Sequence, residues 1–396
     1  MRRRLAPIAI ALALLASAGR AADLDIAFIG TLSGTRAATA RDQLDGFRLA
    51  VRQLGGRLGG VEFSLSLADD QRNPELARQA LENAWEQPHL RVLLLSSSAA
   101  IVDQLVAQSS GHRMVALNLG DASAALAGQG CNANFFSLVV RGDLLQEMSG
   151  QYLQGQGYRR IAVLDSEQNQ RALEAFRKGF KGEIIEIKSP PGSMNFTPAL
   201  AQLRAAKPEA AYFLHRGGMA VQFLLQYAAG HLKEQLPLFG PADSLDQTIL
   251  AASAPAALDL FSVGAWSEDL DAPANKRLSA DFEAEYGRPV SSRAAAGYDA
   301  AMLLDAAIRA VDRKVNDVEA LRAALKRVDF PSTRGSFRFD NDQFPVVNFL
   351  VRQVTADSRG RLINEQRGVL MREVHDSLAH DCPLRAAEPP PPGKPR

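Results

Sequence analysis

A short apolar run that leads directly into a helical segment constrains the fold more than any other feature of this sequence. Val92 to Leu95 is entirely apolar, which is typical of a strand buried on both faces of a parallel sheet. After Ser96, Ser97 and Ser98, apolar residues recur at helical spacing. The first N–H groups of such a helix have no partner within it, so with the hydroxyls they can receive a negative or hydrogen-bond-accepting group. The alternative is an ordinary cap, because serine is a preferred N-cap residue.

The same alternation of strand and helix continues on both sides of this segment. Further strands are expected at residues 24–30, 61–68, 114–117, 160–165, 183–187, 210–214, 260–264, 335–339 and 346–354. Helices are expected between them, at residues 42–54, 74–86, 144–153, 170–180, 197–206, 218–229, 275–286, 292–311 and 318–326. Strands that alternate with helices of this length need crossover connections, so the sequence predicts an α/β fold with two similarly built βα domains.

Composition agrees with this organisation. The chain has 396 residues, of which 46% are hydrophobic and 22% charged, and this is enough for two globular domains. It carries 45 basic and 44 acidic residues, without a long basic stripe. We therefore expect no nucleic-acid partner.

The N-terminus has the pattern of a secretory signal peptide, predicted at residues 1–21. Three arginines precede the apolar run 5–16, and small residues follow, with cleavage expected after Ala18 or Ala21. The alternative is an uncleaved anchor, but the run is shorter than the ~20 apolar residues that a membrane span needs. No cysteine follows the run to carry a lipid. We expect a soluble, exported protein.

The two cysteines, Cys131 and Cys382, would then lie in an oxidising compartment. A disulfide between them would tie the C-terminal region to the body of the protein. Their distance in sequence leaves two separate thiols as the alternative.

Four segments in order resemble the periplasmic leucine/isoleucine/valine-binding family, the type I solute-binding proteins of ABC importers. They are LDIAFIGTLSG with DGFRLAV, GGRLGGVEFSLSLADDQRNPELA, AKPEAAYFLHRGG and AAAGYDAAMLLDAAIRA. The resemblance implies two doubly wound parallel-sheet lobes joined by three crossing strands. Lobe one would comprise residues 22–140 and 266–340, and lobe two residues 141–265 and 341–378. The tail, 379–396, ends in a Pro-rich stretch and is expected to be partly disordered.

In lobe one, the resemblance implies that a ligand carboxylate is held by the turn Ser96, Ser97 and Ser98, with Ser97 as the main contact. The family's next contacts correspond to Asn118, Leu119 and Gly120, where the family's usual threonine is missing. Leu119 offers an apolar wall instead. A bound ammonium needs polar and charged partners to offset its desolvation, so this departure weakens the interpretation as an amino-acid site.

In lobe two, the family contacts correspond to His215, Arg216 and Asp243, with Trp266 at a lobe crossing. Arg216 is expected either to clamp a carboxylate or to lie on the rim, and His215 either to contact ligand or to be a satisfied strand-end histidine. Asp243 is either an acidic contact or a loop residue, and Trp266 either stacks on ligand or fills the hinge. Glu167, in the turn after residues 160–165, either faces an ammonium or is solvated.

Motifs for other chemistry are missing. The sequence contains no GxGxxG, Walker or GxSxG pattern, so we expect no cofactor and no enzyme activity. The one metal-like spacing comprises His375, His380 and Cys382, close to the tail, and we expect no metal site there.

The leading hypothesis is therefore a monomeric periplasmic substrate-binding protein that delivers its ligand to the membrane permease of an ABC importer. Its ligand would be a small polar solute: an amino acid, an organic or aromatic acid, or an alcohol-derived metabolite. Because the amino-acid contacts are altered, the resemblance also suggests a divergent subgroup like those beside quinoprotein alcohol-oxidation systems. The alternative functions are a sensory protein that signals to a membrane receptor and an exported enzyme.

Overall fold

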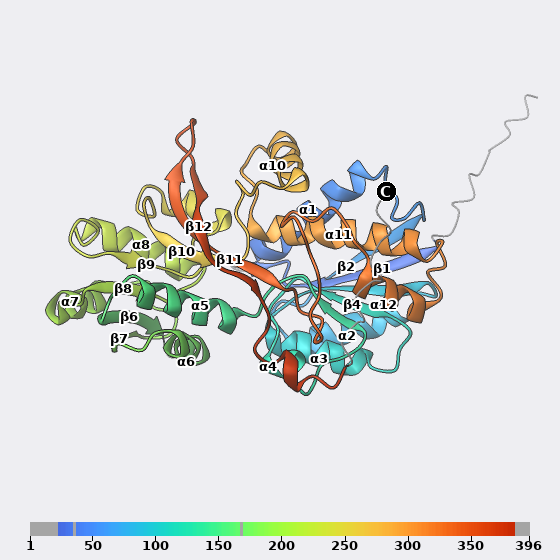
Figure 1. The fold of residues 1–396 in the computed structure, drawn as a ribbon, viewed down its shortest axis with the longest axis horizontal. Coiled ribbons are helices and arrows are strands. Elements are labelled where there is room, and N and C mark those ends of the chain that lie inside the picture. The colour runs from blue at the N-terminus through green and yellow to red at the C-terminus, as the bar shows by residue number, and fades with distance from the viewer. Residues whose placement is uncertain (1–22, 35–36, 167–168, 385–396) are drawn as a thin grey trace, which may run out of the picture.

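The computed structural model describes residues 23–34, 37–166 and 169–384. The predicted signal peptide, Glu167 and the Pro-rich end of the tail lie outside these residues. Figure 1 shows two lobes side by side, each built on its own sheet. No helix among the described residues is both long and apolar enough to cross a membrane.

The first sheet has five parallel strands in the order β2-β1-β3-β4-β5. They are β1 (Leu24–Gly30), β2 (Phe63–Asp69), β3 (Leu90–Ser96), β4 (Val115–Asn118) and β5 (Phe135–Ser137). Most residues of β1 and β3 are buried, because helices cover both faces of this sheet.

Alternate strand residues face two separate apolar clusters. One cluster contains Phe28 and Leu94 together with residues of α1 (Ala37–Gln53), α10 (Pro273–Tyr286), α11 (Ser292–Ala310) and α12 (Val318–Arg327). The other contains Ile29 and Leu95 together with residues of α2 (Pro74–Trp85), α3 (Ala99–Ser109) and α4 (Ala124–Ala127). The period-2 burial of the strands thus produces a three-layer lobe.

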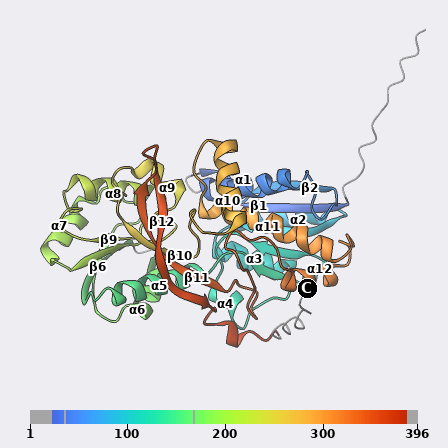
Figure 2. The ribbon, with the colours of Figure 1, turned by 45° about the horizontal axis from the view of Figure 1, so that its top comes forward.

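The second sheet has seven strands in the order β12-β11-β10-β9-β8-β6-β7. They are β6 (Arg160–Ser166), β7 (Glu183–Ser189), β8 (Ala210–Phe213), β9 (Leu238–Phe239), β10 (Phe261–Gly264), β11 (Val347–Ala356) and β12 (Leu362–Val374). Helices α7 (Thr197–Ala206), α8 (Gly218–Ala229) and α9 (Gln247–Ser253) pack on one face. Helices α5 (Gly142–Gly155) and α6 (Gln170–Gly179) pack on the other. The hairpin β11-β12, in orange and red, extends along one edge (Figure 2).

The chain passes between the lobes after β5, after β10 and again between α12 and β11. This arrangement confirms the predicted fold class of two parallel-sheet lobes. One expectation about strands was wrong, because residues 335–339 form only isolated bridges, at Gly335 and Phe339. Three strands, β5, β9 and β12, were not expected. Since β12 is a largely half-exposed edge strand, it lacks the apolar run by which the buried strands were identified.

Helices α1 and α11 approach each other closely through two glycines. A Cβ atom on Gly46 would overlap the carbonyl oxygen of Ala294, and one on Gly297 would overlap that of Gln43. This close approach holds the start of α11 against the first sheet, after the chain has returned from lobe two. It explains why both helix segments that resemble the family carry a glycine.

We predict that Gly297→Ala lowers the free energy of unfolding by about 1–3 kcal/mol or more, because the new methyl group must displace backbone rather than a flexible side chain. Urea unfolding measures this. Gly155→Ala is the matched control, since nothing lies within 4 Å of a Cβ at that position. A stability change as small as the control's would contradict the proposed close approach.

The C-terminal strap, residues 375–384, returns from lobe two to lobe one. Asp376 accepts two hydrogen bonds from the buried guanidinium of Arg141, at 2.6 and 2.9 Å. His375 Nδ1 lies 2.8 Å from Asp340 Oδ2 in the third crossing. Leu378 packs against the cluster of α2, α3 and α4. The strap is therefore a fourth connection between the lobes.

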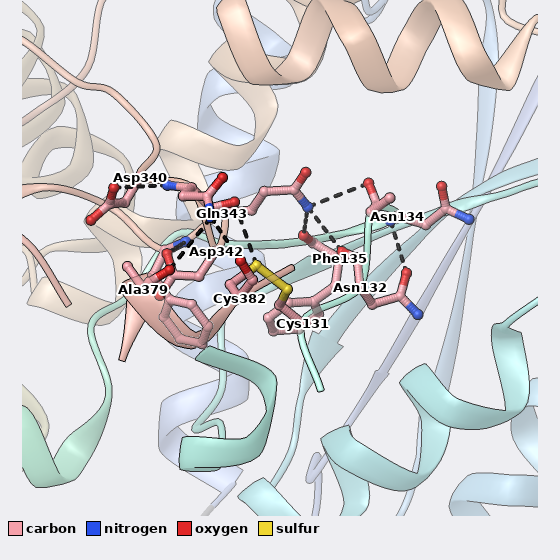
Figure 3. The surroundings of a disulfide bond; sticks show 12 residues. Cys131, Asn132, Asn134, Phe135, Asp340, Asp342, Gln343, Ala379 and Cys382 are labelled. Carbon is pink, nitrogen blue, oxygen red and sulfur yellow. Dashed lines mark hydrogen bonds between the residues drawn. A yellow bond between two sulfur atoms is a disulfide. The ribbon is translucent and has the colours of Figure 1, made fainter. Parts of the chain in front are cut away.

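A disulfide fastens this strap to lobe one. Cys382 is bonded to Cys131, which follows α4, across a sequence separation of 251 residues (Figure 3). Asn341 Nδ2 donates to the carbonyl oxygen of Cys382 at 3.1 Å beside the bond.

We predict that replacing both cysteines by serine lowers the free energy of unfolding by roughly 2–5 kcal/mol, because a long loop of the unfolded chain is no longer closed. Denaturant unfolding measures the loss, and hydrogen exchange should rise first in residues 375–384. Reduced wild-type protein is the control and should match the double variant. Unchanged unfolding of both would refute a stabilising strap.

Candidate functional site

A cleft of about 360 Å³ lies between the lobes, and both contribute to its walls. Lobe one lines it with Thr31, Ala38, Thr39, Ala40, Arg72, Ser96, Ser97, Ser98, Gly120, Asp121 and Arg293. Lobe two lines it with Arg216, Gly217, Gly218, Val221, Asp243, Thr248 and Ile249. The volume is within the range of pockets that hold small molecules, about 300–1,000 Å³.

Strand order places the cleft at the carboxyl ends of both sheets. In lobe one, β1 lies between β2 and β3, and in lobe two, β6 lies between β7 and β8. The order of the first five strands is therefore the same in each lobe, and ligands of such sheets bind where the order reverses. Thr31 and Ser97 follow β1 and β3, while Arg216 follows β8, so the two reversal points face one cleft.

The serine turn after β3 lines the cleft, although its hydroxyls have different partners. Ser96 donates to Oε1 of Gln43, and Ser97 donates to Oδ2 of Asp70. Ser98 is exposed at the N-cap of α3 and makes no side-chain capping bond. Among the residues that the structure describes, the free donors of this turn are thus the Ser98 hydroxyl and the first N–H groups of α3.

The turn after β4 packs directly on the serine turn. Gly120 N and Leu119 N both donate to Leu95 O, and Asp121 N donates to Ser97 O at 3.2 Å. A Cβ on Gly120 would overlap the backbone of Ser97, so no larger residue fits there. This contact explains the missing threonine, because glycine is needed for packing at that position.

Charged side chains from both lobes meet across the cleft. Arg216 Nη1 lies 3.3 Å from Asp243 Oδ2 in lobe two, and Arg293 Nη2 of lobe one lies 3.9 Å from the same oxygen. The Asp243 carboxylate raises the pKa of Arg216, so this guanidinium stays charged. Arg72 is a third arginine of the cleft wall, from lobe one. With Asp121 and Asp243 as the carboxylates of the wall, positive groups outnumber negative ones.

Four of the predicted ligand contacts do not line the cleft. Asn118 and Leu119 have no exposed surface: Asn118 Oδ1 accepts from Gly120 N, and the Leu119 side chain lies in the core. Trp266 is buried in the core and donates from Nε1 to Asn275 Oδ1 at 2.8 Å, so it fills the hinge region. His215 is the fourth predicted contact that does not line the cleft.

His215 fits neither of the roles expected for it. It is fully buried between the rings of Phe196 and Phe223, and burial lowers the pKa of its imidazole to about 4. Neither ring nitrogen has a hydrogen-bond partner among the described residues. It is therefore a neutral core residue that anchors the strand end through its carbonyl oxygen, which accepts from Ser244 Oγ at 2.7 Å.

Sequence reasoning missed several residues of the cleft wall, among them Thr31, Arg72 and Arg293. Thr31 and Arg72 follow β1 and β2, so their place at strand ends was the available signal. Arg293 has no such signal, because it reaches the cleft only through the packing of α11 on α1.

The described residues contain no group of three or more His, Cys, Asp and Glu side chains that could hold a metal ion. Cys382 is committed to the disulfide, so the spacing of His375, His380 and Cys382 cannot supply a thiolate while that bond stands.

The second crossing carries a carboxyl group whose protonation depends on folding. Burial raises the pKa of Glu268 to about 8, with the negative charges of Asp269 and Asp246 adding to the effect. Gln247 Nε2 donates to Glu268 Oε2 at 2.8 Å. Because the folded pKa exceeds the ordinary value of 4.5, folding takes up a proton between these two values, and stability falls as the pH rises through that interval.

We predict that Glu268→Gln removes this dependence, since the amide keeps the shape without the charge. The variant should melt several degrees higher than wild type at pH 8.5 and within a degree or two of it at pH 4.5, because a pKa raised from 4.5 to about 8 corresponds by linkage to several kcal/mol. Melting curves across pH measure it. Glu174→Gln, at an exposed position on α6, is the control. Equal pH profiles for wild type and Glu268→Gln would contradict the prediction.

Comparison with known proteins agrees with this geometry. Residues 23–360 match the family model described as periplasmic binding protein. A solute-binding protein of an ABC transporter from R. palustris, in complex with benzoate, superposes with a TM-score of 0.82 at 27% identity, covering 91% of this chain and 99% of that one. An ABC transporter substrate-binding protein from Sphaerobacter thermophilus gives 0.79 at 26% identity, over 88% and 98% of the chains.

A third structure shares the fold at lower identity. It is a solute-binding protein of an ABC transporter from Rhodopseudomonas palustris BisB5 in complex with 3,4-dihydroxybenzoic acid, with a TM-score of 0.81 and 22% identity over 89% of this chain and 98% of that one. No curated protein sequence matches the chain.

Two lobes with a cleft between their strand ends define a solute-binding protein of the type I periplasmic class. The chain belongs to the periplasmic binding protein family, as its sequence resemblance indicated. Membership implies a periplasmic location and a substrate-binding role.

Proposed function

We propose that this chain is the substrate-binding component of an ABC importer and captures small organic carboxylates, including aromatic acids, in the interlobe cleft. The observation that carries the proposal is the presence of three arginines, Arg72, Arg216 and Arg293, in the wall of one cleft. Guanidinium groups form two-pronged bonds with carboxylates, and the start of α3 adds free N–H donors.

The charge pattern favours an acid over an amino acid. An α-ammonium group needs an available carboxylate, and the best candidate in lobe two is Asp243. Its Oδ2 atom already faces Arg216 and Arg293, at 3.3 and 3.9 Å. Bringing a further cation to this site gains little, because the carboxylate's charge is offset by two guanidinium groups.

Ligand capture is proposed to couple to lobe closure. The lobes already touch beside the cleft, where Ser292 N donates to Asp246 Oδ2 at 3.1 Å. A carboxylate that bridges the α3 terminus of lobe one and Arg216 of lobe two interacts with both lobes only when they are close. Its binding energy then favours the closed form, which is the form a membrane permease would recognise.

The ligands of the structural neighbours support the same chemical class. Benzoate and 3,4-dihydroxybenzoic acid both carry a carboxylate. No aromatic side chain contributes to the cleft wall among the described residues, so the proposed class extends to aliphatic acids.

Export is part of the proposal. Residues 1–21 would be removed during secretion, leaving a monomer in the periplasm that meets a membrane permease. Mass spectrometry of the N-terminus after expression in a Gram-negative host tests the cleavage after Ala18 or Ala21.

We predict that Arg216→Ala weakens the binding of carboxylates by about 10- to 100-fold, because the ligand loses charge-assisted hydrogen bonds from lobe two. Isothermal titration with benzoate, hydroxybenzoates and small aliphatic acids measures the loss. Arg177→Ala is the control, since its guanidinium pairs with Glu186 in an exposed ion pair away from the cleft wall.

Two results would count against the proposed function. Wild-type protein that binds none of these acids would exclude the carboxylate class. Wild-type affinity in the Arg216→Ala variant would exclude the arginine contact while leaving the class in place.

A further inference from the structure

We propose that two buried residues, Asp70 and Gln43, fix the direction of the hydroxyl protons on the lobe-one wall, so that the cleft selects acids that also carry a hydroxyl group. The inference rests on the proposed function and adds a second recognition element to it. Neither residue lines the cleft, so both are positioning residues that act through the side chains in front of them.

Asp70 lies in the turn after β2 and has no exposed surface. Its Oδ1 accepts from Thr31 Oγ1 at 2.7 Å and from Arg72 N at 2.8 Å, and its Oδ2 accepts from Ser97 Oγ. A carboxylate has no proton to donate, so the hydroxyl is the donor in both side-chain bonds. The protons of Thr31 and Ser97 therefore point inward.

Gln43, on α1, sets the third hydroxyl in the same way. Its Nε2 donates to the carbonyl oxygen of Leu119, which fixes the orientation of the buried amide. The amide oxygen Oε1 then faces Ser96 and accepts its proton. A reversed amide would direct its NH₂ group at Ser96 and leave the Leu119 carbonyl oxygen facing another acceptor.

The wall formed by Thr31, Ser96 and Ser97 consequently presents oxygen lone pairs to the cleft. Such a wall accepts hydrogen bonds and repels a ligand carboxylate. This differs from the expectation that Ser97 donates to the carboxylate. A ligand that carries a hydroxyl can donate to these oxygens, whereas a plain acid leaves them unpaired when it displaces water.

Donors and acceptors lie next to each other on lobe one. Ser98, the free N–H groups of α3 and Arg72 border the acceptor wall. The carboxylate is assigned to these donors and to Arg216 across the cleft, and the ligand hydroxyl to Thr31 and Ser97. A neutral hydroxyl fits better than an ammonium group, because three arginines already line the cleft.

The test compares ligands that differ in one donor. Wild-type protein is titrated with the three hydroxybenzoates, the matching fluorobenzoates and benzoate, and with lactate against propanoate. Fluorine is close to a hydroxyl in size but has no proton to donate. We expect at least one hydroxybenzoate to bind about tenfold more tightly than its fluoro counterpart, equal to about 1.4 kcal/mol, or lactate to exceed propanoate by the same factor.

The Asp70→Asn variant tests the positioning role. Its amide must donate to one of the two hydroxyls, which then turns its proton toward the cleft. The preference for the hydroxylated ligand should fall below about threefold, while affinity for the plain acid is kept or rises. Asp69→Asn is the matched control, because that carboxylate accepts from the backbone N–H groups of Leu32 and Gln71 and does not line the cleft.

The outcomes separate the two proposals. Wild-type protein that binds the acids but does not distinguish any hydroxylated ligand from its partner overturns this inference and leaves the proposed function standing. Protein that binds no carboxylate rejects both. An unchanged preference in folded Asp70→Asn protein overturns the role of Asp70. If the variant does not fold, the wild-type ligand pairs still decide the question of selectivity.

Discussion

The site depends on the position of the first strand within each sheet. Because β1 lies between β2 and β3, the loops that follow β1 and β3 lead to helices on opposite faces and leave a crevice between them. In lobe two, α6 and α8, which follow β6 and β8, likewise lie on opposite faces of the sheet. The cleft lies at this edge of both sheets. Its charged residues follow β2, β4, β8 and β9 or lie at the start of α11, and its serine turn follows β3.

The strand ends explain both the success and the errors of sequence reasoning. A buried strand is visible as an apolar run, so the residues after β3 and β8 could be located, and Ser97 and Arg216 indeed line the cleft. The position of a strand end does not show which of the following residues points toward the cleft. Side chains alternate, so Leu119 and His215 point into the core next to residues that line the cleft.

Other parts of the site depend on contacts between distant segments. Arg293 reaches the cleft because α11 packs on α1 through Gly46 and Gly297, and no local pattern records that contact. The disulfide of the strap was predicted from the two cysteines, and the structure contains it. The ion pair of Arg141 and Asp376, which holds the strap beside the crossings, was not predicted, because the two residues are 235 positions apart in sequence. Local periodicity contains no information on such pairs.

The charge of a binding site and the direction of its hydrogen bonds are determined by different residues. The charge of an arginine can be read directly from the sequence, because its guanidinium is always charged and only donates hydrogen bonds. A serine hydroxyl can donate or accept, and its partner decides which. Here the partners are the buried oxygens of Asp70 and Gln43, supplied by β2's exit turn and by α1. The serine turn is therefore visible in the sequence, whereas the residues behind Ser96 and Ser97 determine the direction of their hydrogen bonds.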